Sequence, residues 1–266
     1  MFTMLELIVT LSVIAILVTV LLPRLLKARR RAGYASWLAV RKSHQIDARC
    51  ILYFTFEEGK AARVENLAKA AEVSSLFTPT DLDGVVMEGG VPCSSQWTRG
   101  RFHDKGALHF NGTDTSVQVP YHGALNELKT QAAVEAWVYG SSLTGTRPIL
   151  VRGNDPGSLA LFHDDSAGLG FELGGATCHG PKLEENTWYY VVGVYDETHL
   201  RLYVNGGEVA STAFSGSVTY VPTTAALEIG SGWGRNWRGI IDGVALLRDE
   251  LSPDEVKKSY ELGRTR

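Results

Sequence analysis

The feature that most limits how this chain can fold is an apolar segment near its N-terminus. Residues 2–22 read FTMLELIVTLSVIAILVTVLL, and Glu6 is the only charged residue in the segment. At a rise of about 1.5 Å per residue, a helix of this length reaches about 31 Å, the thickness of the hydrocarbon core of a bilayer. Such an apolar rod is poorly accommodated by water. We therefore expect it to lie in lipid or among copies of itself.

A signal peptide is the main competing interpretation of this segment. Signal peptides have a shorter apolar core, basic residues before the core and small residues at a cleavage site after it. Here the basic residues follow the apolar segment, from Arg24 to Arg31, and no A-x-A-like site comes next. The order of these features favours a membrane helix over a signal peptide.

Glu6 has two interpretations from its position alone. A carboxylate within a membrane helix is costly unless it has a partner, so such residues often mark function. The alternative is that Glu6 lies close enough to the helix start to reach the lipid headgroups and to offset the helix dipole. Both interpretations stay open at this point.

The stretch from Phe2 to Pro23 resembles the mature N-terminus of type IV pilins and pseudopilins, with Glu6 four residues after the leading Phe. The resemblance implies a transmembrane anchor that also packs into the helical core of a filament. Glu6 would pair there with the N-terminal amine of Phe2 on a neighbouring subunit, and Pro23 would kink or loosen the helix. The family has a basic leader ending in glycine before the Phe, whereas Met1 alone precedes Phe2 here.

The charge distribution divides the chain into a basic start and an acidic body. Residues 1–50 carry eight Lys or Arg against two Asp or Glu, and the remainder carries 18 against 27. Basic residues beside an apolar helix suit a membrane surface. An acidic body argues against a nucleic-acid partner. We expect a pilin-like transmembrane or assembly helix at 1–33, a helical stalk at 34–50 with a solvated His44, and a β-domain at 51–266.

Short alternating or apolar runs, separated by Gly, Asn and Asp, fill the body of the chain and predict a β-sandwich or jelly roll. The pairs Asn111-Gly112 and Asn205-Gly206 predict hairpin turns. The expected strands are 51–56, 107–110, 116–119, 133–139, 148–152, 159–163, 169–173, 188–195, 200–205, 226–230 and 239–247.

A short C-terminal helix is predicted after Ser252. Ser252 and Glu255 form a capping-box pattern around Pro253, and Gly263 is a natural stop. We expect this helix to cover an edge or an end of the sandwich.

Four stretches of the body resemble, in order, the laminin-G-like jelly rolls of the concanavalin A-like lectin fold. The resemblance implies two antiparallel sheets packed face to face, with Trp137 and Trp188 as core residues. The four stretches are GALHFNGTDTSVQVP (106–120), AAVEAWVYG (132–140), ENTWYYVVGVYDETHLRLYVNGGEVAS (185–211) and LEIGSGWGRNWRGIIDGVALLRDELSPDEVKKSY (227–260).

Relatives of this domain often bind calcium at the sandwich rim, and the residues that match their acidic positions are Glu57, Glu65 and Asp242. Calcium needs six to eight oxygen ligands on a tightly turning loop. The matching loop here reads ENLAK, which lacks the small oxygen donors, and Lys69 adds a repelling charge. We therefore expect no bound calcium and no other cofactor.

Trp97 and Trp233 are the candidates for a glycan site, because sugars stack on exposed aromatic rings. Packing against the core is the alternative for both, and Trp237 stands where the family has a core aromatic residue. Glycosidases of this fold carry two or three acids on one strand, whereas strands 133–139 and 169–173 hold one Glu each. We expect a protein that is not an enzyme, with a cell-surface glycosidase as the least supported alternative.

Cysteines stand at positions 50, 93 and 178, without a C-x-x-C pair. In an exported protein, Cys93 and Cys178 are the preferred disulfide partners because both lie in the β-domain. Three unpaired thiols are the alternative.

These observations predict a pilin-like or pseudopilin-like structural subunit of the bacterial surface. It would be held in the inner membrane by a single pass or assembled into a filament with itself or other pilin-like subunits. Its exported head would serve adhesion by binding a glycan or a surface protein. The alternative function is a single-pass, membrane-anchored carbohydrate- or protein-binding protein that never polymerises.

Overall fold

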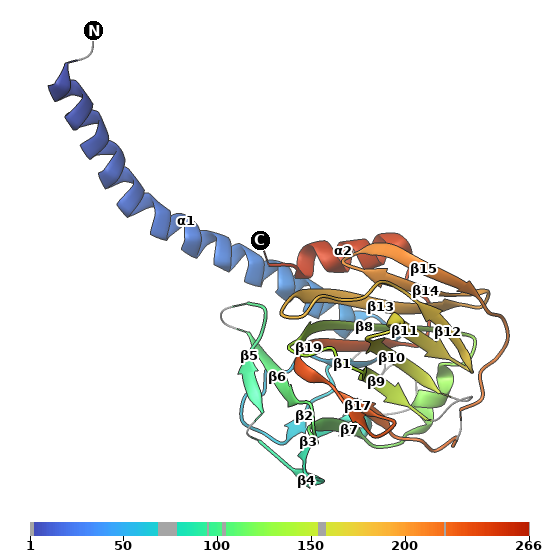
Figure 1. Ribbon diagram of the computed structural model, residues 1–266. Coiled ribbons are helices and arrows are strands. Elements are labelled where there is room, and N and C mark those ends of the chain that lie inside the picture. The colour runs from blue at the N-terminus through green and yellow to red at the C-terminus, as the bar shows by residue number, and fades with distance from the viewer. Residues whose placement is uncertain are drawn as a thin grey trace.

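A long helix, two facing antiparallel sheets and a short second helix make up the protein, in that order (Figure 1). The helices are α1 (Met4–Ile46) and α2 (Pro253–Gly263). This arrangement confirms the predicted fold class. The computed structural model describes residues 3–68, 79–94, 96–102, 105–153, 158–220 and 222–265.

One sheet has eight strands in the described chain, in the order β15-β14-β13-β8-β19-β6-β5, with β1 also paired to β19. We call it the eight-stranded sheet. Its strands are β1 (Cys50–Phe54), β5 (Trp97–Arg99), β6 (Gly106–Asn111), β8 (Gln131–Gly140), β13 (Trp188–Asp196), β14 (His199–Val204), β15 (Gly207–Ala213) and β19 (Arg238–Leu247).

The facing sheet has nine strands in the described chain, in the order β12-β11-β10-β9-β16-β7-β3-β2, with β4 paired to β3. Its strands are β2 (Arg63–Val64), β3 (Gly84–Glu88), β4 (Val91–Pro92), β7 (Ser116–Val119), β9 (Thr146–Arg152), β10 (Leu159–Asp164), β11 (Gly168–Leu173), β12 (Ala176–His179) and β16 (Leu227–Ile229). A small hairpin of β17 (Ser231–Gly232) and β18 (Arg235–Asn236) and the 3-10 turns η2 (Pro79–Leu82) and η3 (Gly123–Glu127) complete the described elements.

Each strand predicted from the sequence is present, with its ends shifted by at most two residues. The strands that the sequence pattern missed include β15, in which no residue is fully buried. Such a strand carries no apolar stripe, so periodicity cannot reveal it.

Two large apolar clusters stabilise the head, which we define as the part of the chain from β1 to α2. The larger cluster lies between the sheets and includes the fully buried Phe110, Phe171 and Trp237. The smaller one lies on the outer face of the eight-stranded sheet and contains Trp137, with Trp188 partly buried against it. Trp137 is therefore buried as expected, but under the helices rather than between the sheets. Burial on both faces explains why β8 reads as a nearly continuous apolar run.

The C-terminal helix α2 has the predicted capping box. The Ser252 hydroxyl accepts a hydrogen bond from the Glu255 backbone, and the Glu255 carboxylate accepts one from the Ser252 backbone at 2.9 Å. The helix ends at Gly263, which lies close against the Trp137 indole and leaves little room for a larger residue. The expected position at an edge or end of the sandwich is wrong, because α2 lies beside α1 over the face of the eight-stranded sheet (Figure 1).

The two Asn-Gly pairs have different outcomes. Asn205 and Gly206 both have positive φ angles, of 51° and 82°, in the tight hairpin between β14 and β15. Asn111-Gly112 does not form a hairpin, because β6 and β7 belong to different sheets. The Asn111 side chain instead accepts from the backbone amides of Thr113 and Asp114 and turns the chain from one sheet to the other. A local turn signal cannot distinguish these two outcomes.

Candidate functional site

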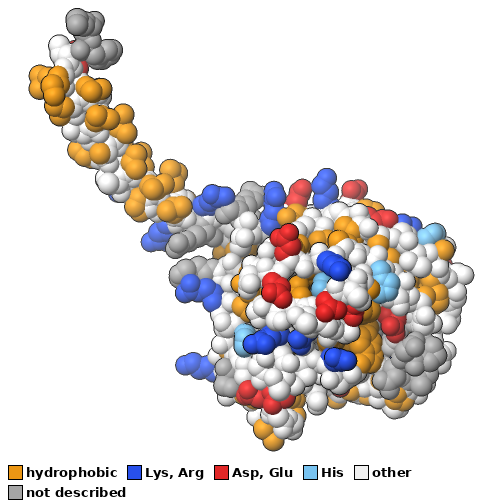
Figure 2. All heavy atoms as spheres, in the orientation of Figure 1, with side chains coloured by type: hydrophobic (Ala, Val, Ile, Leu, Met, Phe, Trp, Pro, Cys, Tyr) orange, Lys and Arg blue, Asp and Glu red, His pale blue; other side chains and the backbone are white. Residues whose placement is uncertain are grey.

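The first part of α1 projects away from the head. We call residues 4–22 the projecting half of α1, and every side chain in it is exposed. Figure 2 shows apolar side chains along this segment, with no part of the head beside it. By length and composition it is able to cross a membrane, although an N-terminal signal sequence passes the same test.

Glu6 caps the start of α1. Its carboxylate accepts a hydrogen bond from the Thr3 backbone at 2.8 Å, and the Thr3 hydroxyl accepts one from the Glu6 backbone at 3.3 Å. The position fits the interpretation in which Glu6 offsets the helix dipole. Phe2, its expected partner on a neighbouring subunit, lies outside the described residues.

Pro23 lies inside α1, which continues through it as a gently curved helix (Figure 1). A proline removes one backbone hydrogen bond, and here the helix bends without breaking. The exposed basic side chains of Arg24, Lys27, Arg29 and Arg31 follow directly. They separate the projecting half from the part of α1 that contacts the head.

The last turns of α1 pack against the head. We call residues 33–46 the docked half of α1. Trp37 is only 2% exposed, and its ring lies 5.0 Å from the ammonium of Lys105. Gly33 lies against the Phe102 ring, where even a Cβ atom would be in tight contact at 3.3 Å. The helix and the head thus meet through a close-packed joint.

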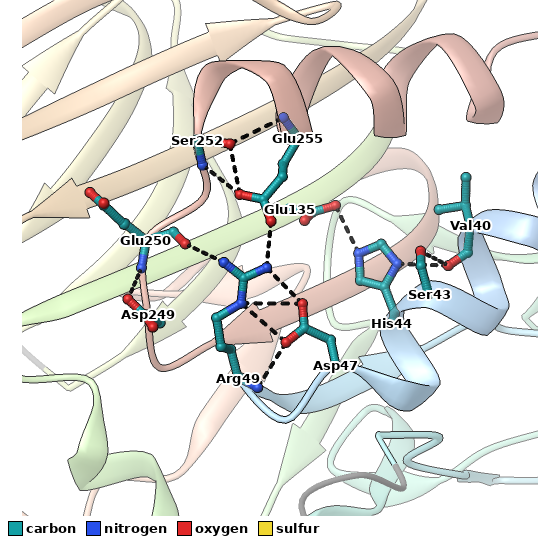
Figure 3. Close-up of polar contacts among 10 residues, drawn as sticks. All are labelled: Val40, Ser43, His44, Asp47, Arg49, Glu135, Asp249, Glu250, Ser252 and Glu255. Carbon is teal, nitrogen blue, oxygen red and sulfur yellow. Dashed lines mark hydrogen bonds and ion pairs between the residues drawn. The ribbon is translucent and has the colours of Figure 1, made fainter.

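His44 is buried in this joint and is not the solvated residue that the sequence suggested. Its Nδ1 lies 2.9 Å from the Val40 carbonyl and its Nε2 3.1 Å from Glu135 (Figure 3). The Tyr190 hydroxyl donates to the same Glu135 oxygen at 2.6 Å. Both ring nitrogens face acceptors, an arrangement that favours the doubly protonated imidazolium form of His44. Burial opposes the charge, but the charge and hydrogen bond of Glu135 outweigh it and raise the pKa of His44.

Arg49 fastens the end of α1 to the start of α2. Its guanidinium donates to Asp47 at 2.8 Å and to Glu255 at 2.6 Å, and also to the Glu250 carbonyl at 3.0 Å (Figure 3). Burial raises the pKa of Glu255, but hydrogen bonds from Arg49 and Ser252 outweigh this and lower it to about 2. Two cavities lie along this joint, of about 30 Å³ and 130 Å³. Ligand pockets are usually of 300 Å³ or more, so this volume suits water rather than a ligand.

Two of the three calcium candidates surround an ammonium group. The Lys105 side chain is fully buried and forms ion pairs with Asp242 and with Glu57, the latter at 3.4 Å. It also donates to the Thr55 carbonyl at 2.7 Å. The exposed Glu65 does not join them. The positive charge that these carboxylates need is therefore supplied by the chain itself, and no metal-binding group of His, Cys, Asp or Glu is found in the described residues.

Asp242 also connects the head to α2. Arg101 donates to it at 3.1 Å and donates to the Gly263 carbonyl at the end of α2. The Arg101 guanidinium lies 3.7 Å from the centre of the Trp137 ring, a cation–π contact. Lys105 and Arg101 hold the pKa of Asp242 low although its burial acts to raise it. Asp242 therefore has a structural role beneath the joint.

The two tryptophan candidates have different surroundings. Trp97, on β5, is partly buried against the core, and its indole donates to the Ala61 carbonyl at 2.9 Å. Trp233, between β17 and β18, is 37% exposed and lies edge-to-face on Phe162 at 5.4 Å. Trp237 is fully buried. Of these rings, only Trp233 presents a substantial surface to a ligand.

The expected disulfide between Cys93 and Cys178 is not formed. Cys178 lies on β12, at one edge of the nine-stranded sheet, whereas Cys93 follows β4, at the opposite edge. The Cys93 thiol donates to Glu88 at 3.1 Å instead. Membership of one domain was too weak a criterion, because a sandwich separates its sheet edges widely.

Residues 111–257, just over half of the chain, match the family described as the concanavalin A-like lectin/glucanases superfamily. The chain belongs to this superfamily. No curated protein matches the sequence. The similarity to this superfamily begins after α1 and ends within α2, so the projecting half lies outside it.

Solved structures with the same fold as this superfamily member include two sugar complexes. Domain 4 of AbnA, an extracellular arabinanase from Geobacillus stearothermophilus, in complex with arabinotriose, aligns with a TM-score of 0.57 and 16% identity over 80% of this chain and 98% of that one. Trypanosoma rangeli sialidase in complex with sialic acid aligns with a TM-score of 0.58 and 15% identity, over 91% of this chain but only 40% of that one.

The single glutamates of β8 and β11 have side-chain partners in this concanavalin A-like protein. Glu135 on β8 faces His44 and Tyr190, and Glu172 on β11 accepts a hydrogen bond from Ser158. Sequence reasoning missed His44 and Glu135 as a pair. The stripe Trp37, Val40 and His44, at i, i+3 and i+7, was a usable signal, because it predicts one buried helix face.

Proposed function

We propose that this protein is a pilin-like, membrane-anchored subunit that displays a glycan-binding head of the concanavalin A-like type. The observation that carries the proposal is the division of α1. Its projecting half exposes apolar side chains on all sides, while its docked half is fixed to the head through Trp37 and His44. A surface that is apolar all round needs lipid or other helices around it.

Glu6 supports the pilin-like version of this anchor. It lies in the first turn of the helix, beside the N-cap residue Thr3. A buried amine would complete its charge in a filament core, as buried ions require. The alternative is a single-pass protein that never polymerises. The same apolar helix would anchor it, but Glu6 would have no role in assembly.

The superfamily and its solved relatives support a glycan as the ligand of the head. The domain of the arabinanase is in complex with arabinotriose and the sialidase with sialic acid. We do not propose catalysis, because Glu135 and Glu172 are hydrogen-bonded to neighbouring side chains and each is the only carboxylate on its strand. We therefore propose that the head binds a glycan and does not cleave it.

Membrane fractionation of the full chain tests the anchor. We expect it in the inner-membrane fraction, resistant to alkaline washing, with the head digested by a protease added to spheroplasts. A full-length product that stays monomeric in buffer without detergent would rule out the anchor.

Assembly is tested by the Glu6→Gln variant, with a photo-crosslinking residue at position 11 in the projecting half. We expect crosslinks between copies to fall about tenfold, which corresponds to about 1.4 kcal/mol for one lost charge pair. Ser12→Ala is the matched control, because its hydroxyl bonds only to the Ile8 carbonyl of the same helix. Equal crosslinking in both variants would show that Glu6 has no role in assembly, and an absence of crosslinks between wild-type copies would favour the non-polymerising alternative.

A further inference from the structure

Three arginines gather near one end of the sandwich. Arg147 lies on β9, Arg235 on β18 and Arg238 at the start of β19. Arg147 donates to the Asn236 carbonyl at 2.9 Å, which joins β9 to the small hairpin. Burial, and then the positive charges of Arg238 and Arg235, lower the pKa of Arg147. Arg238 and Arg235 are therefore near enough to Arg147 for their charges to act on its guanidinium.

Several arginines of the head are neutralised by carboxylates, and this group is not. Arg49, Arg101 and Arg201 each form an ion pair with a carboxylate. None of the three gathered arginines forms an ion pair with a carboxylate among the described residues, and the buried Nε of Arg147 has no acceptor there. Asp165 attracts Arg147 electrostatically, but its carboxylate accepts from the Gly145 backbone at 2.7 Å. Unneutralised guanidinium groups are suited to bind an anion.

Trp233 belongs to the same end of the sandwich. It stands two residues before Arg235, at the tip of the hairpin, with a positive φ of 53° that is unfavourable for a residue other than glycine. Its ring contacts Phe162, which pairs in register with Pro148 on β9. Figure 2 shows basic side chains gathered on the visible face of the head in the region where Figure 1 places β17. The small hairpin thus carries both an exposed aromatic ring, Trp233, and an exposed guanidinium, Arg235.

We propose that Arg147, Arg235, Arg238 and Trp233 form a binding site for an acidic glycan, in which the arginines bind a carboxylate or sulfate and Trp233 stacks on the sugar ring. Planar guanidinium groups bind both kinds of oxyanion in a bidentate manner. The aromatic ring favours a sugar over an acidic peptide or a free anion. The surrounding head is acidic overall, so the attraction is confined to this site. This inference rests on the proposal that the head binds a glycan.

The experiment measures binding of the full chain, in detergent micelles, to three probes. Oligogalacturonate carries carboxylates, dextran sulfate carries sulfates, and unmodified dextran carries no charge. We expect at least one acidic probe to bind, with an affinity that falls as salt is raised, and dextran to bind at least tenfold more weakly. The acidic probe that binds more tightly identifies the anion.

Variants locate the site. The double variant Arg235→Ala/Arg238→Ala removes two exposed charges. We expect its affinity for the acidic probe to be at least tenfold lower than that of the wild type. The matched control is Arg99→Ala/Arg264→Ala, which removes two exposed charges elsewhere and is expected to change binding less than twofold. We expect Trp233→Ala to lower the affinity for the acidic glycan and to leave the affinity for inorganic sulfate unchanged.

The outcomes separate this inference from the proposal on which it rests. If the acidic probe binds equally to the wild type and to the Arg235→Ala/Arg238→Ala variant, the site is wrong although the head binds glycans. If dextran binds as tightly as the acidic probes, the ligand class is wrong. If no glycan binds to the wild type on these probes or on a broad glycan array, the proposed function of the head fails as well.

Discussion

The two halves of α1 belong to one continuous helix but have opposite surroundings. The docked half presents a stripe of Trp37, Val40 and His44, and the head covers it. The projecting half is apolar on every side, and no described residue of the head covers it. One face of a sheet can bury an apolar stripe on a helix, whereas a helix that is apolar on all sides needs lipid or other helices around it. The comparison shows that the head covers the apolar residues of the docked half but leaves those of the projecting half exposed.

The largest expected effect comes from removing the indole at the centre of the docked half. Trp37→Ala should lower the free energy of unfolding of the head by about 3–5 kcal/mol, because it leaves a cavity beneath the helix. Leu17→Ala, in the projecting half, should change it by less than about 0.5 kcal/mol. Urea unfolding of both full-length variants in detergent, followed by tryptophan fluorescence and circular dichroism, measures the difference. Equal losses would mean that the two halves are not distinct.

The His44–Glu135 pair should make the docked half sensitive to pH. Because the folded-state pKa of His44 is raised, the pair contributes fully below the ordinary pKa of histidine. The contribution is lost as the pH rises through the raised value, since neutral His44 offers one proton to two acceptors. Tyr190 donates to Glu135 throughout this range, and Asp47 adds a smaller attraction to the charged ring.

We therefore expect the unfolding free energy of the wild type, relative to His44→Gln, to decrease as the pH rises above about 6.5, the ordinary pKa of histidine, and through the raised pKa of His44. The exposed His109→Gln variant is the control and should keep the pH dependence of the wild type. Unfolding curves at closely spaced pH values give the measurement. A His44→Gln profile parallel to that of the wild type would show that the pair does not titrate with folding.

The smallest expected effect compares one motif at two places. Both helices begin with a capping box, at Thr3 in α1 and at Ser252 in α2. Ser252→Ala should lower the unfolding free energy of the head by about 1 kcal/mol. Thr3→Ala should leave it unchanged, because the start of α1 does not contact the head. A loss in both variants would indicate that the projecting half is coupled to the stability of the head.

The strands and the C-terminal cap were predictable because their signals are local. Strand β8 carries an apolar run, and Ser252 with Glu255 forms a cap within four residues. The Asn111-Gly112 turn was predicted as a hairpin and crosses between sheets instead, since a turn signal does not state which sheet receives the next strand. The burial of His44 was missed for the same reason: its partner Glu135 is 91 residues away in the chain.

The candidate site shows the same limit. Trp233 was named from the sequence, and it is exposed. The three arginines of the proposed site were not named from the sequence. Arg147 is separated from Arg235 by a long stretch of chain, and only the packing of β9 against the small hairpin brings them together. Glu57 and Asp242 were grouped as calcium ligands, and the structure places the Lys105 ammonium between them.

The sequence by itself determined what is local along the chain: a helix too apolar for water, the alternation that makes strands, and the caps and turns that end them. The tertiary structure alone decided which charges meet. The reason is physical, since an ionic contact depends on distance in space, and folding brings residues together that no spacing in the chain relates. His44 with Glu135, Lys105 with Asp242 and the three arginines at the rim all arise in this way.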